Sequence, residues 1–212
     1  MITFKQVQLA FAGQKILDNI SFAVLPGEKV VVLAKSGAGK SSLFSLILGF
    51  LQPDAGEVLV SGRPVDDQRV WEIRQKTAYV DQNFSLGEGK FSDLLDFMLG
   101  LKSNSRLDNS REQLRELLDC FELDQEIVKQ EIETLSGGER QRLAIILAVL
   151  LQRELFLLDE VTSALDKHLK RKVADFFMNR KEWTCLVISH DPVWLEHPAA
   201  KIFDLENKRW KP

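Results

Sequence analysis

The stretch "VVLAKSGAGKSSLFSLILGF", residues 31–50, decides the fold because two different patterns meet in it at a run of small residues. Residues 30–33 are apolar and mostly β-branched, which is typical of a buried strand. After Lys40, apolar residues return at helical spacing, at Leu43, Phe44, Ile47 and Leu48. The stretch therefore predicts a strand, a small-residue loop and a helix, in that order.

The loop has the features of a phosphate site. It holds four small residues: Ser36, Gly37, Ala38 and Gly39. Successive backbone N–H groups of such a loop point inward and meet the positive end of the helix dipole, which suits an anion. Lys40 adds a full positive charge for the β- and γ-phosphates, and the Ser41 hydroxyl can ligate Mg²⁺. We place Ser42, the next residue, in the same predicted site.

This run resembles the Walker A motif, G-x-x-x-x-G-K-[ST], with one departure. Ala34 stands where the motif has its first glycine. Alanine is compatible with the loop if its φ is negative and would be strained at positive φ. The alternative is a chance G-x-G-K-S in an ordinary turn, which the strand–loop–helix context disfavours.

Composition bounds the class of protein. The chain has 212 residues, of which 45% are hydrophobic and 28% charged, so we expect one or two domains with a sizeable core. The net charge of −3 does not support a nucleic-acid partner. The apolar run at 143–151 is shorter than the roughly 20 residues of a membrane span, and no signal peptide precedes "MITFKQVQLAF". We expect a soluble, cytosolic protein in which Cys120 and Cys185 are free, buried or partly buried thiols.

Hydrophobic periodicity divides the chain into a β-rich start and an α/β remainder. Alternation over 2–25 predicts strands, 52–65 reads as turn, strand and turn, 76–82 is a short strand ending at Gln82, and 90–133 is helical. Four elements follow residue 136, namely a helix, a strand at 154–158, a helix at 166–180 and a strand at 184–189, before a short tail. Alternating strands and helices imply a parallel sheet, with ligands at the carboxyl ends of its strands.

The run "LSGGERQR", residues 135–142, predicts a second anion site. Ser136 is placed as a helix N-cap, and Glu139 completes a capping box. Gly137 and Gly138 leave backbone N–H groups open to a close ligand, and the helix dipole favours an anion. Taken alone, the same pattern is also that of any well-capped helix start.

In this order after a phosphate loop, the run resembles the signature motif of the ABC ATPases, and the resemblance extends over nearly the whole chain. Phe11, in "VQLAF", matches the aromatic that stacks on adenine, and Gln82 matches the Q-loop glutamine. "ELFLLDE" resembles Walker B with Asp159 and Glu160, and "SALD", 163–166, resembles the D-loop. His190, after "CLVIS", resembles the switch histidine.

Each residue also has a structural interpretation. Phe11 can be a core aromatic, Gln82 a surface residue, and His190 a structural histidine. Asp159 and Glu160 can be a solvated acidic pair, although four apolar strand residues precede them. His168 and His197 match no motif, and we expect both at the surface.

The resemblance implies the roles of the site residues. Glu160 would be the general base, Mg²⁺ would be held by Ser41 and Asp159, and Gln82 would sense both the metal and the γ-phosphate. Lys40 and His190 would offset charge on that phosphate. Ser136 and Gly138 would act in trans, in a head-to-tail dimer that sandwiches two ATP molecules.

The implied fold is α/β: a P-loop NTPase (RecA-like) core with an N-terminal antiparallel β subdomain and a helical signature subdomain. We expect a single domain over 1–212. The β subdomain and the first part of the core would cover 1–82, the helical subdomain about 83–135, and the rest of the core 136–212.

The implied function is that of an ATP-hydrolysing subunit that powers a separate transmembrane permease, peripheral on the cytoplasmic face of the cell membrane. The insert at 83–135 is too short for the long coiled coil of DNA-repair and chromosome ATPases. One alternative is a soluble, non-transport ABC ATPase acting as an ATP-gated clamp. A P-loop kinase is a third, but it leaves "LSGGERQR" unexplained.

Overall fold

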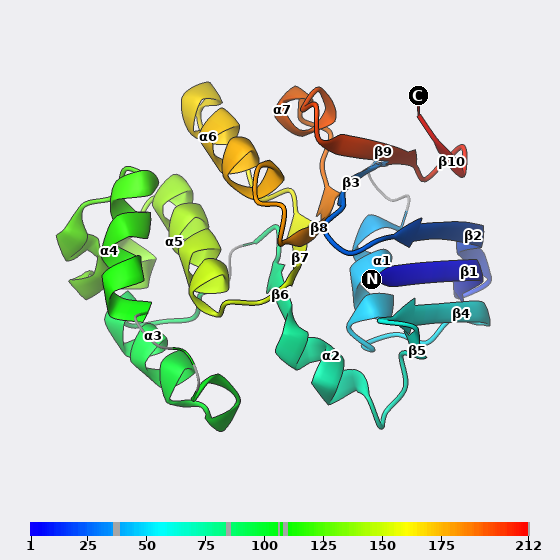
Figure 1. Ribbon diagram of the computed structural model, residues 1–212, viewed down its shortest axis with the longest axis horizontal. Coiled ribbons are helices and arrows are strands. Elements are labelled where there is room, and N and C mark those ends of the chain that lie inside the picture. The colour runs from blue at the N-terminus through cyan, green and yellow to red at the C-terminus, as the bar shows by residue number, and fades with distance from the viewer. Residues whose placement is uncertain (36–38, 84–85, 106, 108–109, 212) are drawn as a thin grey trace.

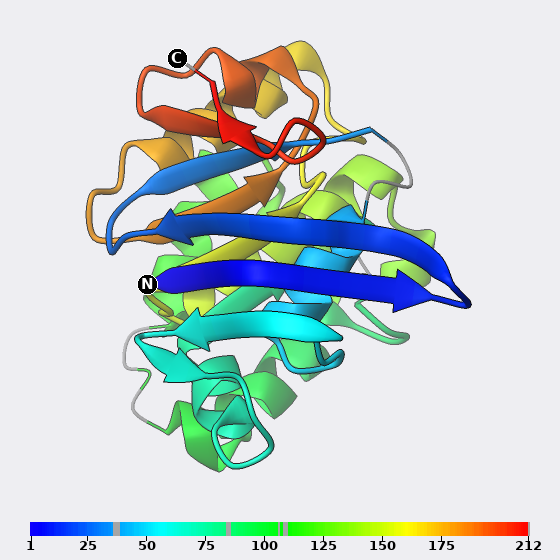
Figure 2. The ribbon, with the colours of Figure 1, turned by 90° about the vertical axis from the view of Figure 1, so that its right-hand side faces the viewer.

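Two β-sheets organise the chain, with one helix between them and most of the other helices on the far side of the larger sheet (Figure 1). The computed structural model describes residues 1–35, 39–83, 86–105, 107 and 110–211. One side of the molecule is built from the antiparallel sheet, the middle from the larger sheet, and the other side from helices only (Figure 1). Viewed from the side, the antiparallel strands lie in front of the parallel ones (Figure 2).

The first sheet is four-stranded and antiparallel, in the order β2-β1-β4-β5. Its strands are β1 (Ile2–Phe11), β2 (Gln14–Val24), β4 (Ala55–Val60) and β5 (Arg63–Pro64). Apolar residues of β1 and β2 are buried at alternating positions, because one face of the sheet packs on the core. The strands predicted over 2–25 and 52–65 are therefore confirmed.

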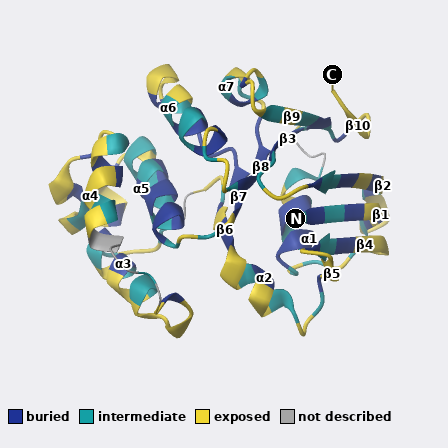
Figure 3. Cartoon of the chain, in the orientation of Figure 1, coloured by how far each residue is buried: buried dark blue, intermediate teal, exposed yellow. Residues whose placement is uncertain are grey.

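The second sheet is six-stranded, in the order β10-β9-β3-β8-β7-β6. Its strands are β3 (Lys29–Leu33), β6 (Thr77–Val80), β7 (Leu155–Asp159), β8 (Thr184–Ile188), β9 (Ala200–Asp204) and β10 (Arg209–Trp210). All neighbours pair in parallel except β10 with β9. Every residue of β7 and β8 is buried, as expected for strands covered on both faces (Figure 3). The predicted α/β class and parallel sheet are confirmed.

The helices fall into two packing groups. Helix α1 (Lys40–Ile47) buries Leu43, Phe44, Leu46 and Ile47 in the core shared by the two sheets. Helices α5 (Gly137–Leu150) and α6 (Lys167–Met178) pack in a second core on the other face. Beyond α5 lie α3 (Phe91–Gly100), α4 (Ser110–Cys120) and three 3-10 helices at Lys102–Asn104, Gln125–Lys129 and Ile132–Thr134 (Figure 1).

Several elements were not predicted from the sequence. Helix α2 (Val70–Lys76) buries only Ile73, so its apolar periodicity is weak. The segment after residue 189, predicted as a short tail, instead holds α7 (Pro192–Leu195), β9 and β10. Strand β9 pairs with β3 along its whole length, yet buries only Phe203 fully, so its sequence lacks the apolar run of a central strand.

Of the four histidines and cysteines whose burial we predicted, one, His197, differs from the prediction. His197 is buried, and its Nε2 lies 3.4 Å from Asp175 Oδ1, whereas we expected it at the surface. His168 is exposed, as predicted. Cys185 is buried and Cys120 partly buried, and both are free thiols, as predicted. Among the described residues, no helix combines the length and the apolar character needed to cross a bilayer.

Candidate functional site

A cavity of about 960 Å³ opens at the carboxyl ends of the parallel strands. The predicted site residues that line it come from every part of the chain: Phe11, Gly39, Lys40, Ser41, Ser42, Gln82, Glu160 and His190. Parallel sheets place their ligands at this edge because the loops that follow the strands converge there. The fold therefore brings together residues that are far apart in the sequence, from Phe11 to His190.

The start of α1 forms one wall of the cavity. Its N-cap is Gly39, whose φ of 83° is left-handed and which has no side chain to cap the helix. A Cβ at this position would lie 2.7 Å from Ile16 Cγ2, so glycine is required for space as well as for conformation. Uncapped amides and the helix dipole leave this wall suited to an anion. The predicted phosphate-loop residues Ser36, Gly37 and Ala38 lie outside the described residues.

Ala34 is compatible with the loop that it begins. It is buried, and positive φ among the described non-glycine residues occurs at other positions. The departure from the Walker A glycine therefore brings no left-handed strain at this residue.

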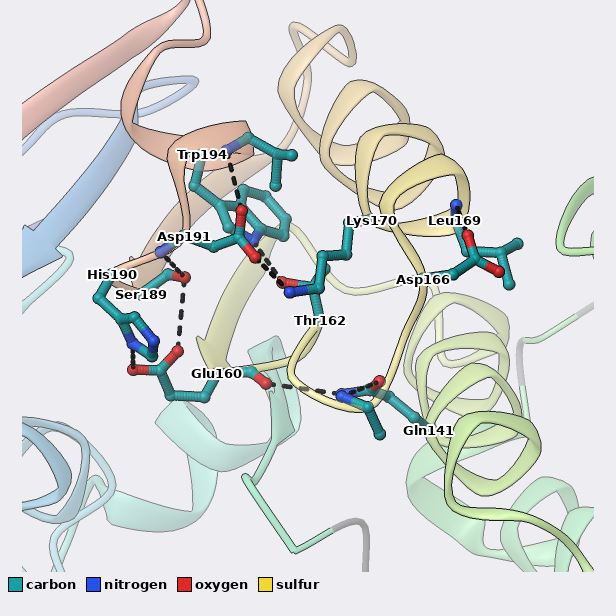
Figure 4. Close-up of polar contacts among 12 residues, drawn as sticks. Gln141, Glu160, Thr162, Asp166, Leu169, Lys170, Ser189, His190, Asp191 and Trp194 are labelled. Atoms are coloured by element: carbon teal, nitrogen blue, oxygen red, sulfur yellow. Dashed lines mark hydrogen bonds and ion pairs between the residues drawn. The ribbon is translucent and has the colours of Figure 1, made fainter.

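Glu160 lies at the centre of the polar contacts (Figure 4). Its carboxylate is 7% exposed, and Oε1 lies 3.3 Å from Lys40 Nζ and 2.9 Å from His190 Nδ1. Oε2 is 3.5 Å from the hydroxyl of Ser189. The backbone of Glu160 has a φ of 49°, a left-handed conformation that is costly for a residue with a side chain. Such strain is typical of functional sites.

Asp159 ends β7 and is also buried. Burial raises the pKa of its carboxyl to about 6, and the charge of Glu160 adds to this rise, while Lys40 and the Ser41 hydroxyl oppose it. Ser41 Oγ lies 3.4 Å from Asp159 Oδ2. Because both acids are buried, the interpretation as a solvated acidic pair is wrong.

The donor set fits Mg²⁺, which prefers oxygen ligands and commonly combines one or two carboxylates with substrate phosphates and water. Ser41 and Asp159 offer a hydroxyl and a carboxylate oxygen side by side. Within the part of the chain that the structure describes, no cluster of three or more His, Cys, Asp and Glu side chains can hold a metal by itself. A divalent ion here would thus depend on phosphate and water for its other ligands.

Phe11 and Gln82 line the cavity at the ends of strands from the two different sheets. Phe11 ends β1 and is 47% exposed, so it is not a core aromatic, and its free ring face suits stacking on a planar base. Gln82 is exposed just after β6, at the edge of the cavity.

The run 135–142 forms the predicted capping box at the start of α5. Ser136 Oγ accepts from the Glu139 amide at 3.3 Å, and the Glu139 carboxylate accepts from the Ser136 amide at 2.8 Å. Ser136 and Gly138 are not among the described residues that line the cavity around Lys40. These two residues therefore do not join the other candidates within one chain.

Sequence reasoning missed part of the cavity wall. Asp204, Glu206 and Asn207 line it from the end of β9. Glu206 accepts from the Lys35 amide at 3.0 Å, which ties this wall to the start of the phosphate loop. The only signal was the alternation in "AKIFDL", residues 200–205, which is short and contains only three strongly apolar residues, Ile202, Phe203 and Leu205.

The family model and the curated relatives that this chain matches agree with one another. The family model described as ABC transporter matches residues 17–163. The ATP-dependent lipid A-core flippase of Xylella fastidiosa strain Temecula1 is 33% identical over 211 residues, covering 93% of this chain and 35% of that protein. The flippase of Haemophilus influenzae is 31% identical and covers 89% and 33%. This chain thus spans about a third of the length of the curated relatives that it matches.

Solved structures agree. A bacterial ABC transporter cassette solved as a dimer has a TM-score of 0.80 at 26% identity, covering 96% of this chain and 94% of that one. The dimer of an ATP-binding cassette in a post-hydrolysis state, with ADP and Pi, has a TM-score of 0.85 at 25% identity, covering 100% and 97%. A bacterial Atm1-family ABC exporter with ATP bound shares the fold, with a TM-score of 0.83 at 24% identity over 100% of this chain and 38% of that one.

Proposed function

Because this chain belongs to the ABC transporter family as an ATP-binding cassette, we propose that it binds and hydrolyses ATP to power a transmembrane partner. The observation that carries the proposal is the buried Glu160 carboxylate, placed between Lys40 and His190 at the edge of the cavity. A carboxylate held between two such groups, beside a helix N-terminus that suits phosphate, has the arrangement that phosphoryl transfer to water requires.

Different residues of the cavity would bind different parts of ATP. Phe11 would stack on the adenine, and the amides at the start of α1 would bind the phosphates together with Lys40. We place Ser36, Gly37, Ala38 and Ser42 in the same phosphate site on the strength of the motif. Ser41 and Asp159 would hold Mg²⁺, with Gln82 beside it, and the ion when bound supplies positive charge to the phosphate oxygens.

Glu160 would act as the general base. It accepts a proton from the water as the water oxygen forms its bond to the γ-phosphorus, and the bond from that phosphorus to the β-γ bridging oxygen breaks. The bond's electron pair leaves with ADP. Lys40 and His190, which both face the Glu160 carboxylate, would stabilise the negative charge that develops on the transferred group.

The proposed partner is a membrane-spanning subunit or domain, with the cassette on the cytoplasmic face of the membrane. Support comes from the flippase relatives, of which this chain spans only about a third. The helical portion at about 83–135, between core segments 1–82 and 136–212, would contact that partner. The same relatives favour transport over the soluble clamp.

The test is Glu160→Gln, which keeps the size of the side chain and removes the base. We expect kcat to fall by roughly 100-fold or more, with ATP affinity within about threefold, since the lost interaction acts mainly in the transition state. ATP binding is measured by calorimetry and turnover by phosphate release. The matched control is Glu126→Gln, an exposed carboxylate in the helical portion. A kcat equal to that of the parent chain would remove Glu160 as the base.

A further inference from the structure

A fully buried amide in α5 contacts the turn that carries Glu160. Gln141 has no exposed surface. Its Oε1 accepts from the Ala164 amide at 3.2 Å, and its Nε2 lies 3.5 Å from the main-chain oxygen of Glu160 (Figure 4). Buried polar groups need partners, and both ends of this side chain find them on one short segment, residues 160–164.

That segment needs external support because its first residue is strained. Glu160 has a φ of 49°, which a non-glycine residue keeps only where its surroundings impose it. The turn closes by a bond from the Ser163 amide to Glu160 O at 3.0 Å. Gln141 contacts the same oxygen and the next amide along, so it acts on the two ends of the turn at once. The backbone of Glu160 in turn sets the direction of its carboxylate toward Lys40 and His190.

The middle of the turn is held from the opposite side. The Trp194 indole of α7 donates to Thr162 Oγ1 at 3.0 Å, and Lys170 of α6 lies 2.6 Å from Asp191, next to His190 (Figure 4). The turn therefore lies between α7 on one side and α5 on the other. The contacts of Gln141 provide the polar connection to α5.

The first residues of α5 rest on the same turn. A Cβ at Gly138 would lie 3.2 Å from Ala164 O, and one at Gly137 would lie 3.8 Å from Ala164 Cβ. The N-terminal end of α5, which carries Ser136, is thus packed against the segment that Gln141 contacts five residues later. A shift of this helix end is passed to the turn because Gly138 and Gln141 lie on the same helix and both lie against residues 160–164.

We infer that Gln141 is a positioning residue for Glu160, and that it couples the Ser136 end of α5 to the orientation of this carboxylate. The inference rests on the proposed function. In the proposed dimer, Ser136 and Gly138 face the partner's ATP, while Glu160 serves the ATP of its own chain. Docking of the partner's phosphate on α5 then orients the base of the other nucleotide site, through one amide side chain.

The main variant is Gln141→Met, which keeps the length of the side chain and removes both polar contacts. We expect kcat to fall by about tenfold or more while KM for ATP stays within about twofold, because the cavity residues that bind ATP are unchanged. The matched control is Val149→Ala, a buried change near the far end of α5. Each chain is assayed at the same interval below its own melting temperature. An equal loss of kcat in the control would reduce Gln141 to a structural role.

A double-mutant cycle separates positioning of Glu160 from any other effect. In the Glu160→Gln background there is no base to position, so adding Gln141→Met should change the residual turnover by less than about twofold. The same fold loss in both backgrounds would overturn the inference. If Glu160→Gln alone keeps the parent kcat, Glu160 is not the base, and both the proposed function of Glu160 and the inference about Gln141 are wrong. If Glu160→Gln loses turnover but Gln141→Met has the same effect in both backgrounds, only the inference about Gln141 is wrong.

Amide hydrogen exchange gives a readout that does not depend on turnover. Without its acceptor, the Ala164 amide in Gln141→Met should exchange about tenfold faster or more in the nucleotide-free chain, whereas Val149→Ala should leave it unchanged. Unchanged protection of residues 160–164 in Gln141→Met would show that the contact does not hold the turn, and would also overturn the inference.

Discussion

At the scale of single residues, two adjacent carboxyl groups at the end of β7 differ in their partners. The Glu160 carboxylate faces Lys40 and His190. The Asp159 carboxylate instead accepts from the neutral hydroxyl of Ser41, and burial raises its pKa to about 6. A buried acid with a raised pKa costs stability whenever it is ionised. Such a cost is expected at a cation site, because a bound cation would offset the charge of the ionised carboxylate.

Asp159→Asn should therefore stabilise the nucleotide-free chain while removing Mg²⁺-dependent turnover. The ordinary pKa of 3.8 rises to about 6 in the folded chain, so the folded state binds more protons than the unfolded state between these values. The contribution of Asp159 to the free energy of unfolding falls as pH rises through this window and stays at its lowest above about pH 6. Removing the charge should gain on the order of 1–3 kcal/mol at pH 7.5.

Thermal melts of both chains at about pH 7.5 and pH 4 check this prediction. The gain should be present at the higher pH and shrink at the lower one, where the parent carboxyl is largely protonated in the folded state. A variant that is no more stable than the parent at pH 7.5 would contradict it.

At the scale of elements, the helices around the site differ in how they begin. Helices α5, α6 and α7 are capped by their own side chains, those of Ser136, Asp166 and Asp191. The N-cap of helix α1 is Gly39, which has no side chain with which to cap the helix. Its first amides are thus left for a ligand, and the left-handed glycine lets the chain enter the helix from the phosphate loop.

Gly39→Ala should weaken ATP binding by about tenfold or more and lower the free energy of unfolding by about 1–2 kcal/mol. The new Cβ would meet Ile16 at 2.7 Å and would force a left-handed alanine. The matched control is Gly62→Ala, where φ is also positive, at 76°, but where a Cβ meets nothing within 4 Å. Calorimetry and thermal melts separate the two costs. If Gly39→Ala binds ATP as well as the control does, the start of α1 is not the phosphate site.

At the scale of the whole molecule, the candidate residues form two separate sites on one chain. Lys40, Glu160 and His190 share the cavity, whereas Ser136 and Gly138 do not line it. A ligand that needs both sets requires a second copy. The dimeric cassettes to which this chain is similar provide the precedent for such an arrangement.

Ser136→Arg tests that arrangement. In the Glu160→Gln background, ATP should produce a dimer, and adding Ser136→Arg should abolish it, because a bulky cation would occupy the place of the partner's γ-phosphate. ATP should still bind to the monomer, since Lys40 and Ser41 are untouched. Sedimentation with ATP and without Mg²⁺ measures both states, and Ser105→Arg, at an exposed serine, is the control. An ATP-dependent dimer that survives Ser136→Arg would argue against the role in trans.

Local patterns in the sequence determined much of the site. The strand and the helix on either side of the predicted phosphate loop, the capping box at Ser136 and the two acids at the end of β7 all follow from side chains within a few positions of each other. Such features depend on the local backbone and on periodic burial, so they can be predicted before any long-range contact is known. The alternation of strands and helices, from which we predicted the parallel sheet, is likewise visible in local sequence patterns.

Only the tertiary structure decided the features that depend on distant partners. Strand β9 gains its place by pairing with β3, His197 is buried beside Asp175, and Glu160 keeps a left-handed backbone within contacts from Ile188 and Gln141. In each case the neighbouring residues in the sequence do not predict the observed strand, burial or backbone conformation. Packing decides there, because the free energy of a buried contact depends on what lies opposite in space, and 120 positions of sequence separate Lys40 from the carboxylate that it faces.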